Sequence, residues 1–291
     1  MDSQGPAVRE LAAEAAFASS RVGREGRLDL AFACEAGRTV LRERRFELPL
    51  QFLEPIDLAG DGSVCVPLLN PTGGVVGGDR LRTRIAIGPD ASVCVTTPSA
   101  TRVYRSDGAP SRIETRIEVA RGAVLEYVPE HLIPHPGARL VQRLDVDVAD
   151  GGRALVWDAY SLGRVARGER FHFERLDLTS RVRVAGRLVF QDRACLVPAE
   201  PTLEPAAGLS YVGSLVAVGP ETAGWEAWAA ELEARPCPSD ARVGASALGA
   251  SGLAMRVLSA TGHGLEAVLL DRWAALRRAW LGRPPLALRK S

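Results

Sequence analysis

Apolar and polar residues alternate with a period of two through most of the first two-thirds of the chain, and this pattern predicts β-strands. The runs at 26–34 and 38–46 flank the turn residues Glu35-Ala36-Gly37 and predict a hairpin. A glycine-bounded turn at 60–62 then leads into an apolar strand at 64–69. Because successive side chains of a strand point to opposite faces, such strands bury one face each and predict packed sheets.

A strand–turn–strand unit recurs along this region. Three copies and a shortened fourth span residues 84–95, 116–127, 144–157 and 181–190. The turn alanines Ala91, Ala123 and Ala154 are spaced 32 and 31 residues apart. A period in this range is typical of stacked repeats, which bury their apolar faces against each other. The pattern predicts stacked hairpins in a sandwich or a β-helix-like coil, with an irregular β-sandwich as the alternative.

After residue 208 the pattern changes to mixed strands and helices. Strands are expected at 211–218, near 243–248 and near 253–258, and helices at 221–235 and 264–281. In the first helix Trp225, Trp228 and Leu232 share one face. In the second, an apolar side contrasts with residues expected outside, namely Asp271, Arg272, Arg277 and Arg278.

The fold class is therefore mainly β with a small C-terminal α+β portion that carries two helices. We expect a lead-in at 1–24 that is disordered or forms a short frayed helix. A β body follows at 25–208, and an α+β portion at 209–291 packs on that body or offers its last helix to a partner.

Composition narrows the function classes. A net charge of +1 with mixed signs gives no electrostatic case for nucleic acid or an anionic membrane. No apolar run approaches the roughly 20 residues of a membrane span, and charged residues interrupt any signal-peptide core. Five cysteines without a CxxC pair indicate neither a zinc cluster nor a disulfide framework, so we expect a reducing, cytoplasmic location.

A glycine-rich stretch follows the strand at 64–69. Gly73, Gly74, Gly77 and Gly78 surround two valines, and Asp79 comes next. This composition predicts a tight, exposed turn, or a hairpin loop in which the aspartate is incidental. A phosphate-binding loop is excluded, because no Lys and Ser or Thr follow the last glycine.

Carboxylates recur where the predicted repeats end. Taken singly each is an ordinary turn residue, but stacking places equivalent ends side by side. They can therefore converge on one edge or on an internal passage; the residues are Asp79, Glu126, Glu130, Asp158 and Asp192. Other chemistry is weaker: prolines around His135 disfavour a helical metal pair with His131, and no serine lies in a nucleophile-elbow context.

Several segments, in order over residues 25 to 285, resemble the urease accessory protein UreD (UreH) family. They are Asn70-Pro71-Thr72-Gly73-Gly74-Val75-Val76-Gly77-Gly78-Asp79, then 97–105, 126–134, and Trp157-Asp158 through Phe171. The chain departs from the family pattern at Arg102, where the family usually has lysine, and in its last residues 287–291.

The resemblance implies a non-catalytic cytoplasmic scaffold. Such proteins bind apo-urease and, with UreF and the GTPase UreG, help load two Ni²⁺ ions into its carbamylated-lysine site. It also implies a β-rich stack of strands whose helical portion docks UreF, a possible pairing of two such heteromeric complexes, and nickel as transient cargo without a tightly bound cofactor.

The resemblance also assigns candidate residues. Matching acidic family positions makes Asp79 and Asp192 the first candidates for a nickel passage. The second group of carboxylates is Glu126, Glu130, Asp158 and Glu169. Loop-holding residues are expected to be the four glycines together with Arg102, Tyr104, Arg105 and Arg164. Partner contact is expected from Trp273, Arg277 and Arg278.

Two other function classes stay open. A β-solenoid carbohydrate-active enzyme would use a carboxylate pair, although the chain is only 5% aromatic. A purely structural adaptor would have no metal role.

Overall fold

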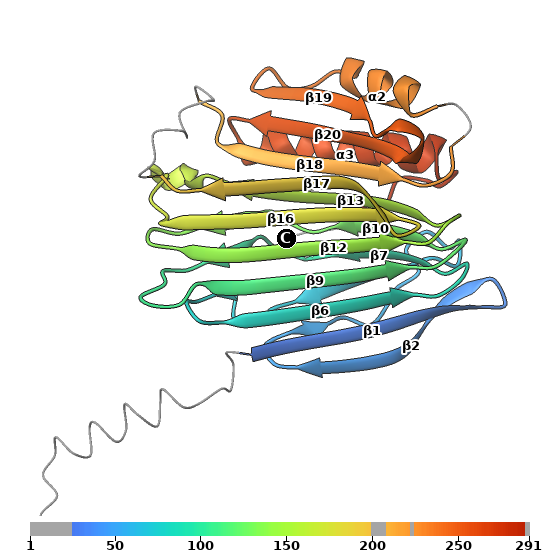
Figure 1. The fold of residues 1–291 in the computed structure, drawn as a ribbon, viewed down its shortest axis with the longest axis horizontal. Coiled ribbons are helices and arrows are strands. Elements are labelled where there is room, and N and C mark those ends of the chain that lie inside the picture. The colour runs from blue at the N-terminus through green and yellow to red at the C-terminus, as the bar shows by residue number, and fades with distance from the viewer. Residues whose placement is uncertain (1–24, 199–207, 222–223, 289–291) are drawn as a thin grey trace, which may run out of the picture.

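The computed structural model describes residues 25–198, 208–221 and 224–288, and the predicted lead-in at 1–24 lies outside them. Two β-sheets face each other, and two helices cover the outer face of the second sheet (Figure 1). The mainly β fold class with two helices is confirmed.

The seven-stranded sheet forms one layer. In spatial order it contains β17 (Arg187–Leu196), β16 (Arg175–Val184), β12 (Arg139–Val148), β9 (Ser111–Val119), β6 (Arg80–Ile87), β1 (Glu25–Glu35) and β2 (Arg38–Glu47). The hairpin of β1 and β2 is the one predicted, with left-handed φ values at Ala36 and Gly37.

The eleven-stranded sheet forms the second layer. Its main path is β19 (Ala241–Ala247), β20 (Gly252–Ser259), β18 (Tyr211–Val218), β13 (Arg153–Ser161), β10 (Val124–Val128), β7 (Ser92–Thr96), β4 (Val64–Leu69) and β3 (Gln51–Phe52). Three short strands pair beside this path: β5 (Gly74–Val75), β8 (Thr101–Val103) and β11 (Leu132–Pro134). A ribbon of β14 (Gly163–Arg164) and β15 (Glu169–Arg170) encloses the 3-10 turn η1 (Val165–Arg167), and a second 3-10 turn, η3 (Gly249–Ser251), precedes β20.

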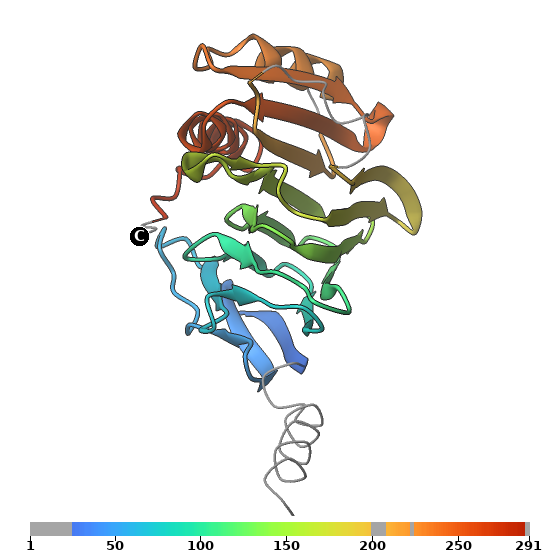
Figure 2. The same ribbon diagram turned by 90° about the vertical axis from the view of Figure 1, so that its left-hand side faces the viewer.

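The predicted repeats are coils that pass from one sheet to the other. In each of the pairs β6–β7, β9–β10 and β12–β13, the two strands lie in opposite sheets and pair in parallel with the neighbouring coils (Figure 2). The units are thus stacked, as predicted, but they are not hairpins, because their two strands do not pair with each other.

Two details of the predicted repeat are wrong. Val124 pairs with Ser92, 32 residues earlier, but also with Arg153, so Ala154 lies beside Leu125 and not beside Ala123. The second and third turns have the same length, because Val119 pairs with Val148 and Val124 pairs with Arg153. Gly152 therefore occupies the position equivalent to Ala123, where a Cβ would lie 2.8 Å from the Ala120 oxygen. The fourth copy is a true hairpin: β16 turns through Ala185 and Gly186 into β17 of the same sheet.

Burial follows the layers. Strand β6 alternates exposed and buried residues because the seven-stranded sheet faces solvent on one side. Strand β7 is buried throughout, because the eleven-stranded sheet has a core on each face. One core fills the space between the sheets, and the other lies under the helices, where Trp157 meets Trp273 with ring centroids 5.8 Å apart.

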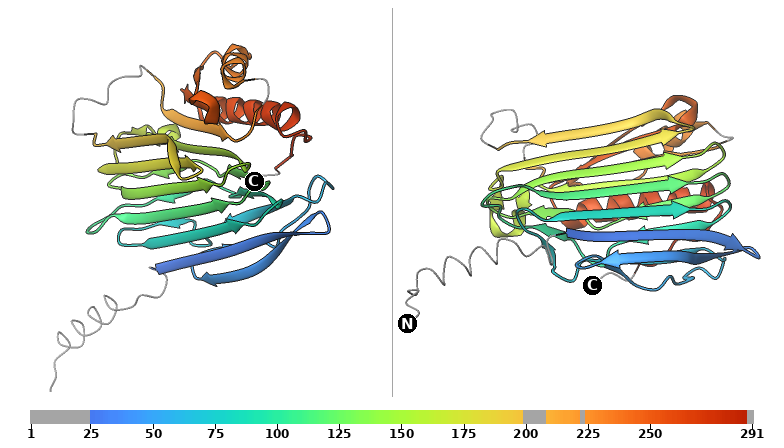
Figure 3. Two further views of the ribbon diagram at one scale, coloured as in Figure 1. Left: turned by 45° about the vertical axis from the view of Figure 1, so that its right-hand side comes forward. Right: turned by 60° about the horizontal axis from the view of Figure 1, so that its bottom comes forward.

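The C-terminal portion extends the second sheet. Strand β18 pairs with β13, and helices α2 (Trp225–Ala234) and α3 (Gly262–Ala279) pack on the outer face (Figure 3). Helix α2 begins at Trp225, four residues later than predicted, and its predicted apolar face is buried. Within the described residues, neither helix is long and apolar enough to cross a membrane.

Candidate functional site

A cavity of about 470 Å³ lies between the two sheets, beneath the glycine-rich loop and the loop at 97–101. Much of its wall is apolar, but Glu130, Asp158 and Gln142 also line it. Two of the predicted passage carboxylates therefore share one hollow.

Polar side chains extend from this cavity in two facing rows, one on each sheet, and Leu144 interrupts the first row. Across the seven-stranded sheet, Thr115, Leu144, Ser180 and Asp192 are successive register partners. Across the eleven-stranded sheet, Asp158, Ser214 and Arg256 are successive partners. These positions face the space between the sheets because they share the period-two phase of residues that pack in the core there, such as Val156, Val216 and Ala254.

The two rows are joined by crossed hydrogen bonds. Ser180 Oγ donates to Asp158 at 2.8 Å, and Ser214 Oγ donates to Asp192 at 3.1 Å. Arg256 forms an ion pair with Asp192 at 2.7 Å. Each carboxylate is thus held by a serine from the opposite sheet, which places Asp158 and Asp192 in one polar cluster.

Asp158 accepts further hydrogen bonds in this cluster. Gln142 Nε2 donates to both of its oxygens, at 3.1 and 3.0 Å. Burial raises the pKa of Asp158, and the nearby Asp192 charge adds to the rise, against the lowering effect of the Ser180 and Gln142 hydrogen bonds. Burial likewise raises the pKa of Tyr160 to about 12.

Glu130 lies where the cavity meets a smaller hollow of about 80 Å³ beneath α3. Its backbone N–H donates to Thr97 Oγ1 at 2.8 Å, and its carboxylate lies 3.8 Å from His131 Nδ1. The loop at 97–101 therefore fixes Glu130 at the edge of the cavity.

Asp79 closes the glycine-rich loop instead of lining the cavity. One of its carboxylate oxygens accepts from Val76 N at 2.9 Å, and the side chain is buried. The prediction of an exposed turn is wrong for part of this loop, because Gly74 and Val75 form the buried strand β5 against β8. A Cβ on Gly74 would lie 2.3 Å from the Arg102 backbone oxygen, so this close pairing requires glycine.

Glu126 points away from the cavity, to the outer face of the eleven-stranded sheet. It accepts a hydrogen bond from Trp273 Nε1 at 2.6 Å and pairs with the Arg277 guanidinium. Both members of the ion pair are buried. Glu126 thus anchors α3 to the coil.

The expectation that Arg272 and Arg277 lie outside is wrong. Arg277 follows Trp273 by four residues, so the two share a helix face, a spacing visible in the sequence. Arg272 donates to the carbonyl oxygens of Leu232, Arg235 and Pro236 at the end of α2. Trp273 and Arg277 both contact Glu126 of this chain. Of the three predicted partner residues only Arg278 is exposed.

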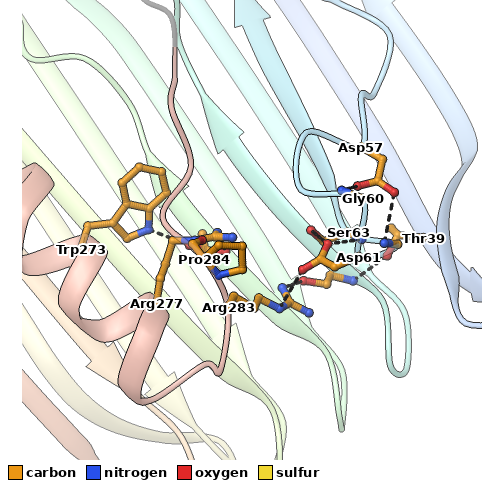
Figure 4. A network of polar contacts seen from close by, with 12 residues as sticks. Thr39, Asp57, Gly60, Asp61, Ser63, Trp273, Arg277, Arg283 and Pro284 are labelled. Atoms are coloured by element: carbon orange, nitrogen blue, oxygen red, sulfur yellow. Dashed lines mark hydrogen bonds and ion pairs between the residues drawn. The ribbon is translucent and has the colours of Figure 1, made fainter.

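The same network continues into the tail after α3 (Figure 4). Arg277 Nε donates to Pro284 O at 2.8 Å. Arg283 then contacts Ser92 and forms an ion pair with Asp61 at 3.5 Å. The tail at 280–288, which we call the strap, therefore connects α3 to the early coils. Sequence patterns did not indicate this contact.

Glu169 lies on the β14–β15 ribbon, remote from the cavity lining. It forms a two-point pair with Arg164, one bond at 2.6 Å, and this hydrogen bonding lowers the pKa of Glu169. Of the other predicted loop residues, Tyr104 packs edge-on against His135 at 4.8 Å, and Arg105 forms an exposed ion pair with Asp107.

Metal-binding groups are dispersed in this arrangement. Among the described residues, no three His, Cys, Asp or Glu side chains are grouped so that they could hold a metal ion. None of the five cysteines, all of which lie in the described part of the chain, forms a disulfide bond; Cys65 and Cys94 are register neighbours buried beneath the helices.

A coil of parallel strands with a polar cluster inside, extended by a helix-covered sheet, defines this chain as a β-solenoid-like protein. The chain belongs to the UreD urease accessory protein family, whose profile matches residues 24–291. It is 36% identical to the urease accessory protein UreD of Delftia acidovorans, over 90% of this chain and 93% of that one. Identity to the UreD of Cupriavidus metallidurans is 38%, over 90% and 92%, and to that of Herpetosiphon aurantiacus 33%, over 91% and 96%. None of these relatives bears the name of a carbohydrate-active enzyme.

Proposed function

We propose that this chain is a non-catalytic cytoplasmic scaffold that binds apo-urease. It acts with UreF and the GTPase UreG in GTP-dependent insertion of nickel, and Ni²⁺ passes through its interior as transient cargo. Membership in a family of urease accessory proteins supports the urease role. The observation that carries the passage is the inter-sheet cavity that joins Glu130 to Asp158, with Asp192 next in the cluster.

The chemistry of the cluster suits transit better than storage. Ni²⁺ accepts carboxylate, imidazole and water ligands, and a conduit must hold the ion weakly enough to release it. Carboxylates that are dispersed along a path offer few ligands at any one point. Asp158 has a raised pKa, so it loses its charge at a higher pH than an ordinary aspartate and would then cease to attract the ion.

The cavity geometry narrows the residues assigned to the passage. Glu130, Asp158 and Asp192 carry the ion in our proposal. Asp79, Glu126 and Glu169 instead hold a loop, a helix and a ribbon in place through the hydrogen bonds described above.

The test is nickel delivery by variants in the assembled system. The chain is co-expressed with urease, UreF and UreG, and nickel per urease active site is measured by elemental analysis. We expect Asp158→Asn and Asp192→Asn to lower the nickel content several-fold while gel filtration shows an assembled complex. The matched control is Asp107→Asn, since Asp107 is exposed and its ion-pair partner within the described residues is the exposed Arg105.

The outcomes separate passage from a purely structural role. Full nickel loading in the Asp158→Asn, Asp192→Asn double variant would show that the chain is a structural adaptor without a metal role. Loss of the complex in that variant would assign both residues to folding. Gel filtration of the intact complex also measures whether two heteromeric complexes pair.

A further inference from the structure

A second pocket, of about 420 Å³, lies where the ends of β8, β11 and β13 meet the β14–β15 ribbon. It shares no lining residue with the inter-sheet cavity. Its wall carries the cationic or polar side chains of Arg102, Arg164, Arg167, His135, Tyr104 and Tyr211. The nickel passage proposed above does not use this pocket.

Positive charge dominates this wall. Arg164 is paired with Glu169, the one carboxylate that directly neutralises it. The guanidinium groups of Arg102 and Arg167 make no hydrogen bond or ion pair with any residue in the described part of the chain, and both side chains are exposed. Three guanidinium charges are therefore balanced by one carboxylate. The guanidinium groups of Arg102 and Arg167 are available to bind a ligand.

The strand geometry aims these groups into one space. Strand β8 alternates sides, so Val103 is buried while Arg102 and Tyr104, two residues apart, both line the pocket. Tyr104 packs against the ring of His135. Partial burial lowers the pKa of His135, and the Arg164 and Arg102 charges lower it further, against the raising effect of the Glu169 charge.

We propose that this pocket binds a ligand that carries a carboxylate or phosphate group, held by the free guanidinium groups of Arg102 and Arg167. Guanidinium forks match the paired oxygens of both groups and form strong charge-assisted hydrogen bonds with them. The pocket is within the size range of small-molecule sites, roughly 300–1,000 Å³, and exceeds what a bare ion fills. The ligand therefore contributes contacts beyond its anionic group, for which Ile133 and the tyrosine rings are available.

The test is calorimetric titration of the full chain with succinate and, separately, with inorganic phosphate at low ionic strength. We expect saturable binding of at least one probe. Removal of one charged hydrogen-bonding partner, in Arg102→Ala or Arg167→Ala, is expected to weaken that binding roughly 10- to 100-fold. Arg102→Lys keeps the charge without the fork and is expected to weaken it less than Arg102→Ala does.

The matched control is Arg121→Ala. Arg121 is also an exposed arginine without an ion pair among the described residues, but it lies at the turn between β9 and β10, at the other end of the strands. Binding that is lost equally in Arg121→Ala, or that persists unchanged in Arg102→Ala, would overturn the proposal. Absence of binding heat with both probes would do the same.

A second arm identifies the source of the anionic group. If the group belongs to a protein partner, Arg102→Ala weakens capture of urease or UreF, and succinate or phosphate competes with that capture. If the group belongs to a free small molecule, capture is unchanged while the titration still shows the loss. Both results require the pocket, whereas nickel delivery is tested separately through Asp158 and Asp192.

Discussion

Asp158, which is half-buried, and Glu126, which is buried, are carboxylates in neighbouring strands with different partners. Asp158 accepts hydrogen bonds from the neutral Gln142 and Ser180 side chains, and these lower its pKa by less than burial raises it. Glu126 has a buried arginine against it, and the pair fixes α3 on the sheet. Removal of one partner from the buried Glu126–Arg277 pair would therefore leave an uncompensated buried charge.

The raised pKa of Asp158 makes a prediction about stability and pH. Its native form retains the proton at pH values where the unfolded chain has lost it, so its contribution is full below the unfolded pKa and falls as pH rises through the native pKa. Asparagine does not titrate, so the Asp158→Asn variant does not lose stability in this way as the pH rises. We expect the free energy of unfolding of the variant, relative to the wild type, to increase from pH 4 to pH 7 in urea titrations; a decrease would contradict the assigned cause.

The Glu126–Arg277 ion pair makes a second prediction about stability. Glu126→Gln leaves the Arg277 charge buried without its counter-charge, and we expect a loss of about 3 to 5 kcal/mol in the free energy of unfolding. Adding Arg277→Met should recover part of this loss, because the unpaired charge is then removed. A double-mutant cycle by urea denaturation measures the coupling, and simple additivity would show that the pair is not coupled.

At the scale of elements, short strands and turns fix the geometry around the cavity. Strand β5 has only two residues, yet its pairing with β8 positions the glycine-rich loop above the cavity. The tail after α3 acts similarly on the outer face, where it connects α3 to β7 and to the turn before β4.

Gly74→Ala tests the pairing of β5. The added Cβ would collide with backbone at Arg102, which cannot shift without loss of the β5–β8 contact. We expect a loss of at least about 1 to 3 kcal/mol by thermal or urea denaturation. Gly244→Ala is the control, because nothing lies within 4 Å of a Cβ at that position; equal effects at both glycines would refute the packing argument.

Arg283→Met tests the strap. It removes the contacts to Ser92 and Asp61 while it keeps a similar apolar stem, and we expect a loss of about 1 kcal/mol with faster hydrogen exchange at Arg277 and in the tail. Arg278→Met, at an exposed residue, should change stability by less than about 0.5 kcal/mol. Unchanged exchange in Arg283→Met would show that the strap does not depend on these contacts.

At the scale of the molecule, the stacked coils and the C-terminal portion share one sheet. Strand β18 continues the sheet at β13, and the Glu126–Arg277 pair and Arg283 connect α3 and its tail back to the early coils. Units joined by so much shared structure depend on one another for stability.

We therefore predict that the β body and the C-terminal portion unfold together. Calorimetry of the full chain should give one transition whose calorimetric and van't Hoff enthalpies agree. Arg277→Met should shift this transition as a whole. Two separated transitions, with only the later one sensitive to the substitution, would mean that the portions are independent.

The sequence determined the elements and their inward faces, because strand and helix periods are local properties. The β1–β2 hairpin, the strand β4, the stacked units and the apolar faces of both helices could be read from it. Family resemblance also indicated Asp158 and Asp192, but not that serines of opposite sheets would bring them together.

Only the tertiary structure decided which residues meet across the layers. The register of the third unit, the buried strand at Gly74, the buried Arg272 and Arg277, and the strap at Arg283 depend on partners between about 30 and 190 residues away in the chain. Such contacts follow from the stacking of coils and the docking of α3, which no local pattern contains. The separation of Glu126 from Asp158 depends on the register of β10 against β13. Glu126 pairs with Leu155, three residues before Asp158, so the two carboxylates face different layers.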